Sequence, residues 1–191
     1  MTWIKVCGIT STSDAEAAIE AGVSAIGLVF ATSPRQVTIE KALEIAALVR
    51  DRVEIVGVFK DSTRVEMAHA ALRFDRVQIH ADARLRVVVP VLRAVRPYEF
   101  DPAAPMNEGE MTLIDGSEGR GQTFDWTQIR SKPFRLVIAG GLTPENVGEA
   151  IAAARPFGVD VSSGVENAPG RKDPEKMRRF VAAVRRADGI R

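Results

Sequence analysis

The sequence predicts an α/β protein, a compact (β/α)8 TIM barrel in which helices 4 and 5 are reduced or missing. Two observations support this fold. Short apolar, β-rich runs alternate along the chain with helical patterns, and eight such runs follow one another with no long break. Strands separated by crossover helices pair in parallel, and eight of them favour a closed barrel over an open sheet.

The eight predicted strands share a short length and an apolar core. They are Trp3–Cys7, Ala25–Phe30, Glu54–Phe59, Arg76–His80, Val88–Val95, Met111–Asp115, Arg135–Ala139 and Val159–Ser162. Capping residues mark the helix starts between most of them. A Ser-x-x-Glu capping box begins at Ser13, and a Thr-x-x-Glu box begins at Thr63. Thr38 precedes a helical pattern, while Thr143 and Asp173 each precede a proline at the first helical position.

One side of the predicted barrel is thin. The fourth and fifth strands begin too close together for a crossover helix, so residues 81–87 have room for a turn or two at most. Residues 96–110 contain three prolines, which disfavour a helix after the fifth strand. An exposed apolar face is a liability, so we expect irregular chain or a partner chain to cover these two strands.

Composition places the chain among single-domain proteins. Its 191 residues, 46% of them hydrophobic, suffice for one core, and we expect residues 1–191 to form one domain. The net charge is +1 and the arginines are spread along the chain, which argues against nucleic-acid or anionic-membrane partners. A lone cysteine excludes an intramolecular disulfide and a cysteine-cluster metal site. Without a membrane-length apolar run or a signal-peptide core, a soluble cytoplasmic protein is expected.

The candidate site lies where the strands end, because barrels place their functional groups at the C-terminal ends of strands. Cys7 ends the first strand, although a lone cysteine is more often a small buried hydrophobe. Glycine-rich loops after strands seven and eight are the usual phosphate site of a barrel, since backbone N–H groups there approach an anion closely. The positions following the predicted strands hold Cys7, Arg35, His80, Asp125, Gly140, Gly141, Ser163 and Gly164.

Several of these residues have a structural interpretation as well. Asp125-Trp126-Thr127-Gln128 matches a helix N-cap with a capping-box Gln, and Gly140-Gly141 matches a tight turn. We interpret His80 as a packing residue at a strand end and His69 as a surface residue. Asp160 faces the barrel mouth or serves as a buried hydrogen-bond anchor, and the role of Lys5 stays open.

Eight short motifs run through the chain in order. They are Lys5-Val6-Cys7-Gly8-Ile9-Thr10, Gly27-Leu28-Val29-Phe30, Ser33-Pro34-Arg35, Val56-Gly57-Val58-Phe59, Val77-Gln78-Ile79-His80, Gly121-Gln122-Thr123-Phe124-Asp125-Trp126, Ala139-Gly140-Gly141-Leu142-Thr143-Pro144-Glu145-Asn146-Val147 and Gly158-Val159-Asp160-Val161-Ser162-Ser163-Gly164-Val165-Glu166. Together they resemble the phosphoribosylanthranilate isomerase family from Ile4 to about Val184. The chain departs from the family pattern at Gln36, Ala81 and Arg93, where an aromatic residue, a glycine and a lysine are usual.

The resemblance implies an isomerase of tryptophan biosynthesis. Its reaction is the Amadori rearrangement of N-(5′-phosphoribosyl)anthranilate to 1-(2-carboxyphenylamino)-1-deoxyribulose 5-phosphate, with no metal and no cofactor. By similarity, Asp125 is the acid that protonates the furanose ring oxygen and Cys7 is the base that takes the C2′ proton. Arg35 binds the anthranilate carboxylate. The phosphate binds at Gly140, Gly141, Ser163 and Gly164.

Two alternatives stand beside this function. A histidine-pathway ribosyl isomerase performs the same chemistry on a larger bis-phosphorylated substrate, and it would need a carboxylate in place of Cys7 and a second phosphate loop. A non-catalytic phosphate-binding barrel would fit the trimmed helices, and it predicts loss of Cys7 or Asp125 before loss of the phosphate loops. The substrate is expected to be a small phosphorylated sugar, and the oligomeric state stays open.

Overall fold

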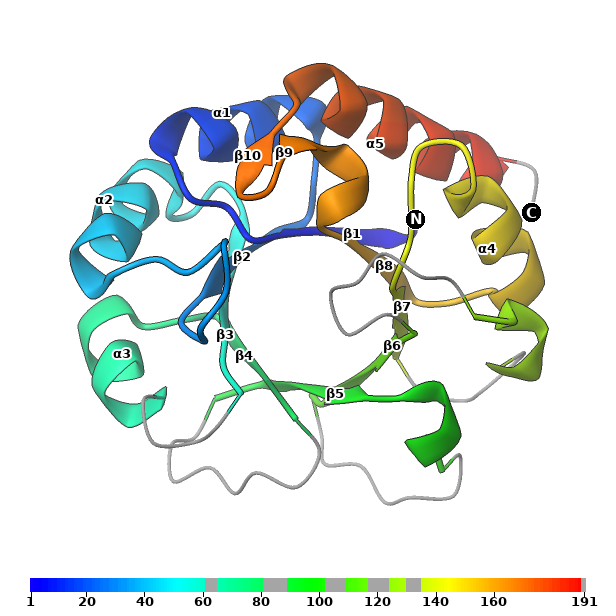
Figure 1. The fold of residues 1–191 in the computed structure, drawn as a ribbon, viewed down its shortest axis with the longest axis horizontal. Helices are drawn as coiled ribbons and strands as arrows, with labels where there is room; N and C mark the ends of the chain where they lie inside the picture. The colour runs from blue at the N-terminus through cyan, green and yellow to red at the C-terminus, as the bar shows by residue number, and fades with distance from the viewer. Residues whose placement is uncertain (61–64, 81–88, 102–108, 117–123, 130–134, 190–191) are drawn as a thin grey trace.

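The structure is a closed parallel barrel of eight strands, as the sequence predicts (Figure 1). This computed structural model describes residues 1–60, 65–80, 89–101, 109–116, 124–129 and 135–189. The barrel strands are β1 (Trp3–Cys7), β2 (Ala25–Val29), β3 (Glu54–Val58), β4 (Arg76–His80), β5 (Val91–Val95), β6 (Met111–Asp115), β7 (Leu136–Ala139) and β8 (Gly158–Val161). Each strand pairs with the next along the chain, and β1 pairs with β8 to close the barrel.

Within the described residues, five α-helices lie outside the strands (Figure 1). They are α1 (Thr12–Ala21), α2 (Ile39–Val49), α3 (Val65–Leu72), α4 (Val147–Ala154) and α5 (Pro174–Gly189). Their apolar sides pack with the outward-facing strand residues into one large core. No helix in the described ranges is long and apolar enough to cross a membrane.

Two predicted helix starts agree with the structure and two differ. Thr38 caps α2, and Asp173 accepts hydrogen bonds from the backbone N–H groups of Glu175 and Lys176 at the start of α5. For α1, Ser11 is the cap in place of Ser13, because the extended backbone at Ser11 lets its hydroxyl accept from the backbone N–H of Asp14. The capping box predicted at Thr63 lies in residues that the structure does not describe.

The helix predicted to begin after Thr143 begins at Val147. The hydroxyl of Thr143 accepts from the Glu145 N–H, and the Asn146 side-chain oxygen accepts from the Thr143 N–H at 2.8 Å. These local bonds hold a non-helical turn, because short polar side chains compete with the helix for backbone groups. The prediction was therefore wrong by one helical turn.

The fifth strand also begins later than expected. Val89 and Pro90 precede β5, which starts at Val91. Proline has no N–H to donate to a strand ladder, although the Pro90 carbonyl still accepts from the N–H of Val77 on β4. Between β5 and β6 the described chain holds a single 3₁₀ turn, η1 (Pro97–Glu99). The stretch expected to lack helix 4, residues 81–87, lies outside the described residues.

The barrel interior has a polar half and an apolar half. Lys5 on β1 reaches Gln78 on β4, and since these strands are not neighbours, the contact crosses the interior. Side chains alternate along a strand, so Trp3 and Cys7 face inward with Lys5. The apolar half is a separate cluster of alternate residues on β5, β6 and β7, namely Leu92, Ala94, Met111, Leu113, Val137 and Ala139.

Candidate active site

The predicted site residues all lie at the C-terminal ends of barrel strands or in the loops after them, which is the catalytic face of this architecture. Cys7 is the last residue of β1, and Arg35 lies in the loop after β2. Asp125 lies between β6 and the 3₁₀ helix η2 (Trp126–Ile129). Gly140 and Gly141 follow β7. Ser163 and Gly164 follow β8 and open η3 (Ser163–Val165).

Cys7 is a buried free thiol at the start of the β1 loop. The following residue, Gly8, has φ +76°, and a Cβ built there would lie 2.5 Å from Cδ of Arg35. Only glycine fits this position, because the backbone is left-handed and Arg35 packs directly over it. The first loop therefore brings Arg35 close to Cys7.

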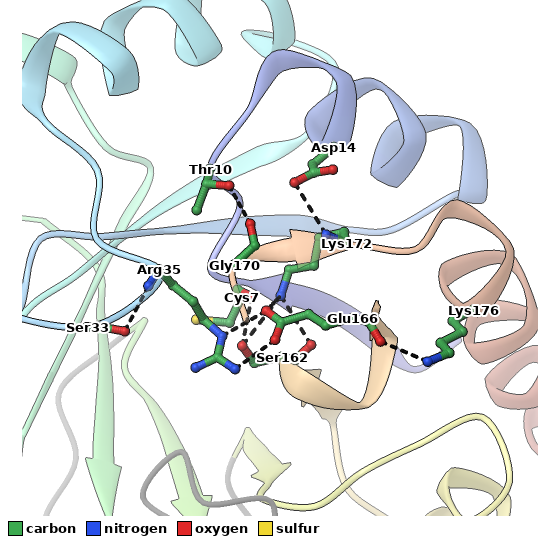
Figure 2. A network of polar contacts seen from close by, with 10 residues as sticks. All are labelled: Cys7, Thr10, Asp14, Ser33, Arg35, Ser162, Glu166, Gly170, Lys172 and Lys176. Atoms are coloured by element: carbon green, nitrogen blue, oxygen red, sulfur yellow. Dashed lines mark hydrogen bonds and ion pairs between the residues drawn. The ribbon is translucent and has the colours of Figure 1, made fainter. Parts of the chain in front are cut away.

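A bidentate ion pair fixes Arg35. Its Nε donates to Oε1 of Glu166 and its Nη2 donates to Oε2, each at 2.8 Å (Figure 2). Lys172 donates to the same carboxylate at 2.8 Å and to the carbonyl oxygen of Ser162 at 3.1 Å. Burial alone would raise the pKa of Glu166, but the hydrogen bonds from Arg35 and Lys172 outweigh it and lower that pKa. Burial lowers the pKa of the Lys172 ammonium, which Glu166 opposes.

Glu166 and Lys172 belong to a hairpin that the sequence analysis did not identify. The strands β9 (Glu166–Ala168) and β10 (Arg171–Lys172) pair antiparallel and follow β8 and η3. Pro169-Gly170 between them is a turn signal that would have marked it. Neither charged residue carries a local pattern that predicts its partner.

The hairpin is fastened to the loops after β1 and β2. The hydroxyl of Thr10 donates to the Gly170 carbonyl at 2.6 Å, and a Cβ at Gly170 would lie 2.8 Å from the carbonyl oxygen of Pro34. The Ser162 hydroxyl donates to the carbonyl oxygen of Cys7 at 3.1 Å. These contacts gather Cys7, Arg35 and the hairpin at one edge of the barrel mouth (Figure 2).

The two glycine loops touch each other. Gly140 and Gly141 have φ of +92° and +64°, a conformation that glycine adopts without strain. A Cβ at Gly164 would overlap the carbonyl oxygen of Leu142, so the loop after β8 packs directly on the loop after β7. Asn146 braces the first loop by donating from Nδ2 to the Gly141 carbonyl at 2.9 Å. The sequence analysis did not single out Asn146.

Asp125 is exposed and behaves locally as a cap. Its Oδ1 accepts from the Thr127 N–H at 3.0 Å and from the Thr127 hydroxyl at 2.7 Å. The capped element is the 3₁₀ helix η2, so the structural interpretation of this carboxylate is supported. The capping-box partner predicted at Gln128 has a side chain outside the described part of the chain.

Lys5 and Asp160 meet beneath Cys7. Nζ of the fully buried Lys5 lies 3.0 Å from Oδ1 of Asp160, which places Asp160 inside the barrel. His69, expected at the surface, is half-buried beside Phe74, with ring centroids 6.0 Å apart. The side chain of His80 lies outside what the structure describes.

Comparison with known proteins decides the family. The family model described as N-(5′-phosphoribosyl)anthranilate (PRA) isomerase matches residues 4–183. The chain belongs to this family. It is 41% identical over 201 residues to the N-(5′-phosphoribosyl)anthranilate isomerase of Acidithiobacillus ferrooxidans, covering 97% of this chain and 98% of the relative.

Solved structures agree with the family assignment. A phosphoribosyl anthranilate isomerase from Thermus thermophilus superposes with a TM-score of 0.88 at 29% identity, covering 100% of both chains. Another isomerase of this family was solved in complex with reduced 1-(o-carboxyphenylamino)-1-deoxyribulose 5-phosphate. It superposes with a TM-score of 0.81 at 33% identity, covering 99% of this chain and 100% of the other. The predicted barrel and the predicted isomerase function in tryptophan biosynthesis are confirmed, while the roles of individual residues stay predictions.

Proposed function

We propose that the chain performs the Amadori rearrangement of N-(5′-phosphoribosyl)anthranilate with Asp125 as general acid and Cys7 as general base. Asp125 gives a proton to the furanose ring oxygen, the C1′–O bond breaks, and an iminium forms. Cys7 then takes the C2′ proton, and the resulting enolamine tautomerises to the ketone. No electrons leave the substrate and no group departs, so proton transfer and positioning account for the reaction.

The position of Cys7 supports its role as base. It lies on the inward face of β1 at the catalytic end of the barrel, where a substrate bound at the mouth meets it. Burial raises the pKa of its thiol, and Lys5 and, more weakly, Lys172 oppose that rise. Because the base must be the thiolate, the positive charges around Cys7 are part of the proposed site.

The geometry of Arg35 supports its role in binding the anthranilate carboxylate. Glu166 occupies the edge of the guanidinium formed by Nε and one Nη2 hydrogen. A guanidinium has five N–H donors, and the edge formed by Nη1 and the second Nη2 hydrogen makes no hydrogen bond with the described residues, so it can donate to a second carboxylate. Glu166 therefore fixes the direction in which Arg35 presents that edge.

The contact between the two glycine loops supports phosphate binding at Gly140, Gly141, Ser163 and Gly164. Both loops lie at the catalytic face after β7 and β8, which is where barrels of this class bind phosphate. Glycines without side chains let an anion approach the backbone amides closely. Anchoring the phosphate here and the carboxylate at Arg35 would place the ribose between them, beside Cys7.

The acid role of Asp125 has a physical requirement. A general acid must carry its proton when the substrate is bound, and Asp125 is exposed to water in the described structure. A proton-donating Asp125 therefore needs the bound substrate to shield it from water, which favours the neutral carboxyl. The hydrogen bonds from Thr127 orient the carboxylate, which is compatible with both capping and catalysis.

The test is the fluorescence assay of anthranilate-adduct turnover with purified Cys7→Ala. We expect kcat to fall about 10²- to 10⁴-fold, as for loss of a general base. Affinity for the reduced product analogue should change little, because the proton transfer occurs only in the transition state. Lys41→Met, which removes an exposed lysine of α2 that pairs with Glu44, is the control. Near-normal turnover by Cys7→Ala would overturn the assignment.

We also propose a cytoplasmic location and a partner list limited to the small phosphorylated substrate. The near-neutral net charge of +1 supports the second point, because nucleic-acid binding needs a concentrated basic surface. The single cysteine is in keeping with a reducing compartment. Fractionation of cells that express the chain tests the location.

A further inference from the structure

The barrel interior holds a charged residue that takes no part in the proposed proton transfers. The Lys5 side chain is fully buried, and its Nζ donates to Oε1 of Gln78 at 2.9 Å and to Oδ1 of Asp160 at 3.0 Å. An unpaired ammonium inside a protein is strongly destabilising, so these partners are needed to keep the charge in place. Gln78 and Asp160 come from β4 and β8, so Lys5 spans the barrel beneath the mouth.

The end of Lys5 lies beside the thiol of Cys7. Cys7 is two residues further along β1 and faces the same way. Gly27 on β2 is level with Cys7 in the sheet register. A Cβ built on Gly27 would lie 2.9 Å from Sγ of Cys7 and 3.1 Å from Cε of Lys5. The absent side chain leaves the space in which the thiol and the lysine terminus meet.

The charges around Cys7 come from several elements. Lys5 and Asp160 lie beneath it, Lys172 lies on the hairpin, and Arg35 lies over Gly8; the charges of Asp160 and of both lysines act on the thiol. Glu166 binds both Lys172 and Arg35 and so offsets their charges. Asp115 on β6 acts on Asp160. Lys5 thus has a stronger effect on the thiol than Lys172, and Asp160 is the anion that limits it.

The energetic balance on Lys5 keeps it charged. Burial alone would lower the pKa of the ammonium, but Asp160 and Cys7 outweigh burial and raise it. A permanently charged ammonium favours an anion at a neighbouring sulfur. Burial disfavours the same anion, so the thiolate population depends on Lys5.

We propose that Lys5 is the positioning residue that stabilises the thiolate of Cys7, with Gln78 and Asp160 holding its ammonium in place. The inference deepens the proposed function, because it rests on Cys7 as the base. Lys5 need not touch the substrate, since it acts through the sulfur. The covalent chemistry is unchanged: the C2′ proton moves to sulfur.

The experiment titrates the thiolate of the sole cysteine by its ultraviolet absorbance. For each variant, the absorbance of the same variant carrying Cys7→Ser is subtracted. The difference cancels the signal of Tyr98 and leaves that of Cys7 alone. Lys5→Met should raise the midpoint of the thiolate titration by about one unit or more, the size expected for loss of an adjacent opposite charge. Asp160→Asn should move the midpoint in the opposite direction.

A second comparison guards against misfolding, because Lys5→Met leaves Asp160 buried without its cation. The double variant Lys5→Met/Asp160→Asn removes both charges, and its midpoint should lie above that of Asp160→Asn alone. Lys41→Met, which removes an exposed lysine that pairs with Glu44, should leave the midpoint unchanged. A midpoint that does not rise in either Lys5 variant overturns the proposal.

The acid limb of the kcat/KM pH profile gives the link to catalysis. In Lys5→Met this limb should move to higher pH together with the midpoint of the thiolate titration. A midpoint that rises while the limb stays in place would support the effect of Lys5 on Cys7 and count against Cys7 as the base. The titration therefore tests the effect of Lys5 on Cys7, and the pH profile tests Cys7 as the base, so either proposal can be overturned without the other.

Discussion

Arg35 and Glu166 form a parallel two-bond ion pair between the loop after β2 and the hairpin after β8, with both nitrogen–oxygen distances at 2.8 Å. The side chains are 15% and 5% exposed, so water screens the pair weakly. The pair joins chain segments that lie on either side of β1 and fixes the orientation of the guanidinium. Charge-assisted pairs of this geometry supply directional specificity as well as energy.

Glu166→Gln should therefore impair substrate binding more than chemistry. Without the carboxylate, Arg35 loses its fixed orientation, and we expect KM to rise about tenfold, in line with the 1.5–3 kcal/mol of a hydrogen bond to a charged group. The value of kcat should change less than KM, because Glu166 takes no part in the proton transfers and acts on Cys7 only through Lys172 and Arg35. Steady-state kinetics measures both.

Two further variants make this result interpretable. Glu166→Gln also leaves Lys172 buried without a counter-charge, so Glu166→Gln/Lys172→Met separates misfolding from the loss of orientation. Glu175→Gln removes an exposed carboxylate paired with Arg178 and should leave KM unchanged. A loss of kcat as large as the change expected for KM, with KM itself unchanged, would contradict the role given to Glu166.

The stability of the chain should depend on Glu166 in acid. The pKa of Glu166 is lower in the folded protein than its ordinary value of about 4.3, because Arg35 and Lys172 hydrogen-bond its carboxylate. A lowered folded pKa gives stability that is present above the unfolded pKa and is lost as the pH falls through the folded pKa. Measured by urea unfolding, the difference in free energy of unfolding between wild type and Glu166→Gln should shrink below about pH 4.3. A difference that stays constant across that range would count against the ion pair.

Gly164→Ala should separate the two glycine loops after β7 and β8. A Cβ at this position overlaps the Leu142 carbonyl oxygen, and backbone cannot yield as a flexible side chain does. We expect inorganic phosphate to lose most of its competitive inhibition and KM to rise by about tenfold or more. Gly148→Ala is the matched control, since a Cβ there meets nothing within 4 Å and alanine stabilises α4. Unchanged phosphate inhibition in Gly164→Ala would place the phosphate elsewhere.

Asp125→Asn should abolish turnover and leave the fold intact. Asparagine is as good an N-cap as aspartate, so the free energy of unfolding should change by less than about 0.5 kcal/mol. Asp125→Ala should lose about 1 kcal/mol as well as activity, because it removes the acceptor for the Thr127 N–H. Chemical denaturation measures the change in stability, and the turnover assay measures the change in activity. An Asn variant with near-normal turnover would show that Asp125 is a cap only.

Local patterns in the sequence are sufficient to predict the barrel fold. Strand bounds such as Trp3–Cys7 and Met111–Asp115 were predicted as observed, because apolar runs bounded by turn residues carry a local signal. Boundaries failed where side chains bonded their own backbone, as at Thr143, or where proline interrupted a run, as at Pro90. The β9–β10 hairpin was missed because its strands are very short.

The sequence by itself determined the alternation of strands and helices, and with it the placing of Cys7, Arg35 and the glycine loops at strand ends. The tertiary structure alone decided which charges meet. Arg35 and Glu166 are 131 residues apart in the chain, and Lys5 and Asp160 are 155 residues apart. Such pairs exist only once β8 closes on β1, because closure and register bring distant side chains to the same face and depth of the barrel.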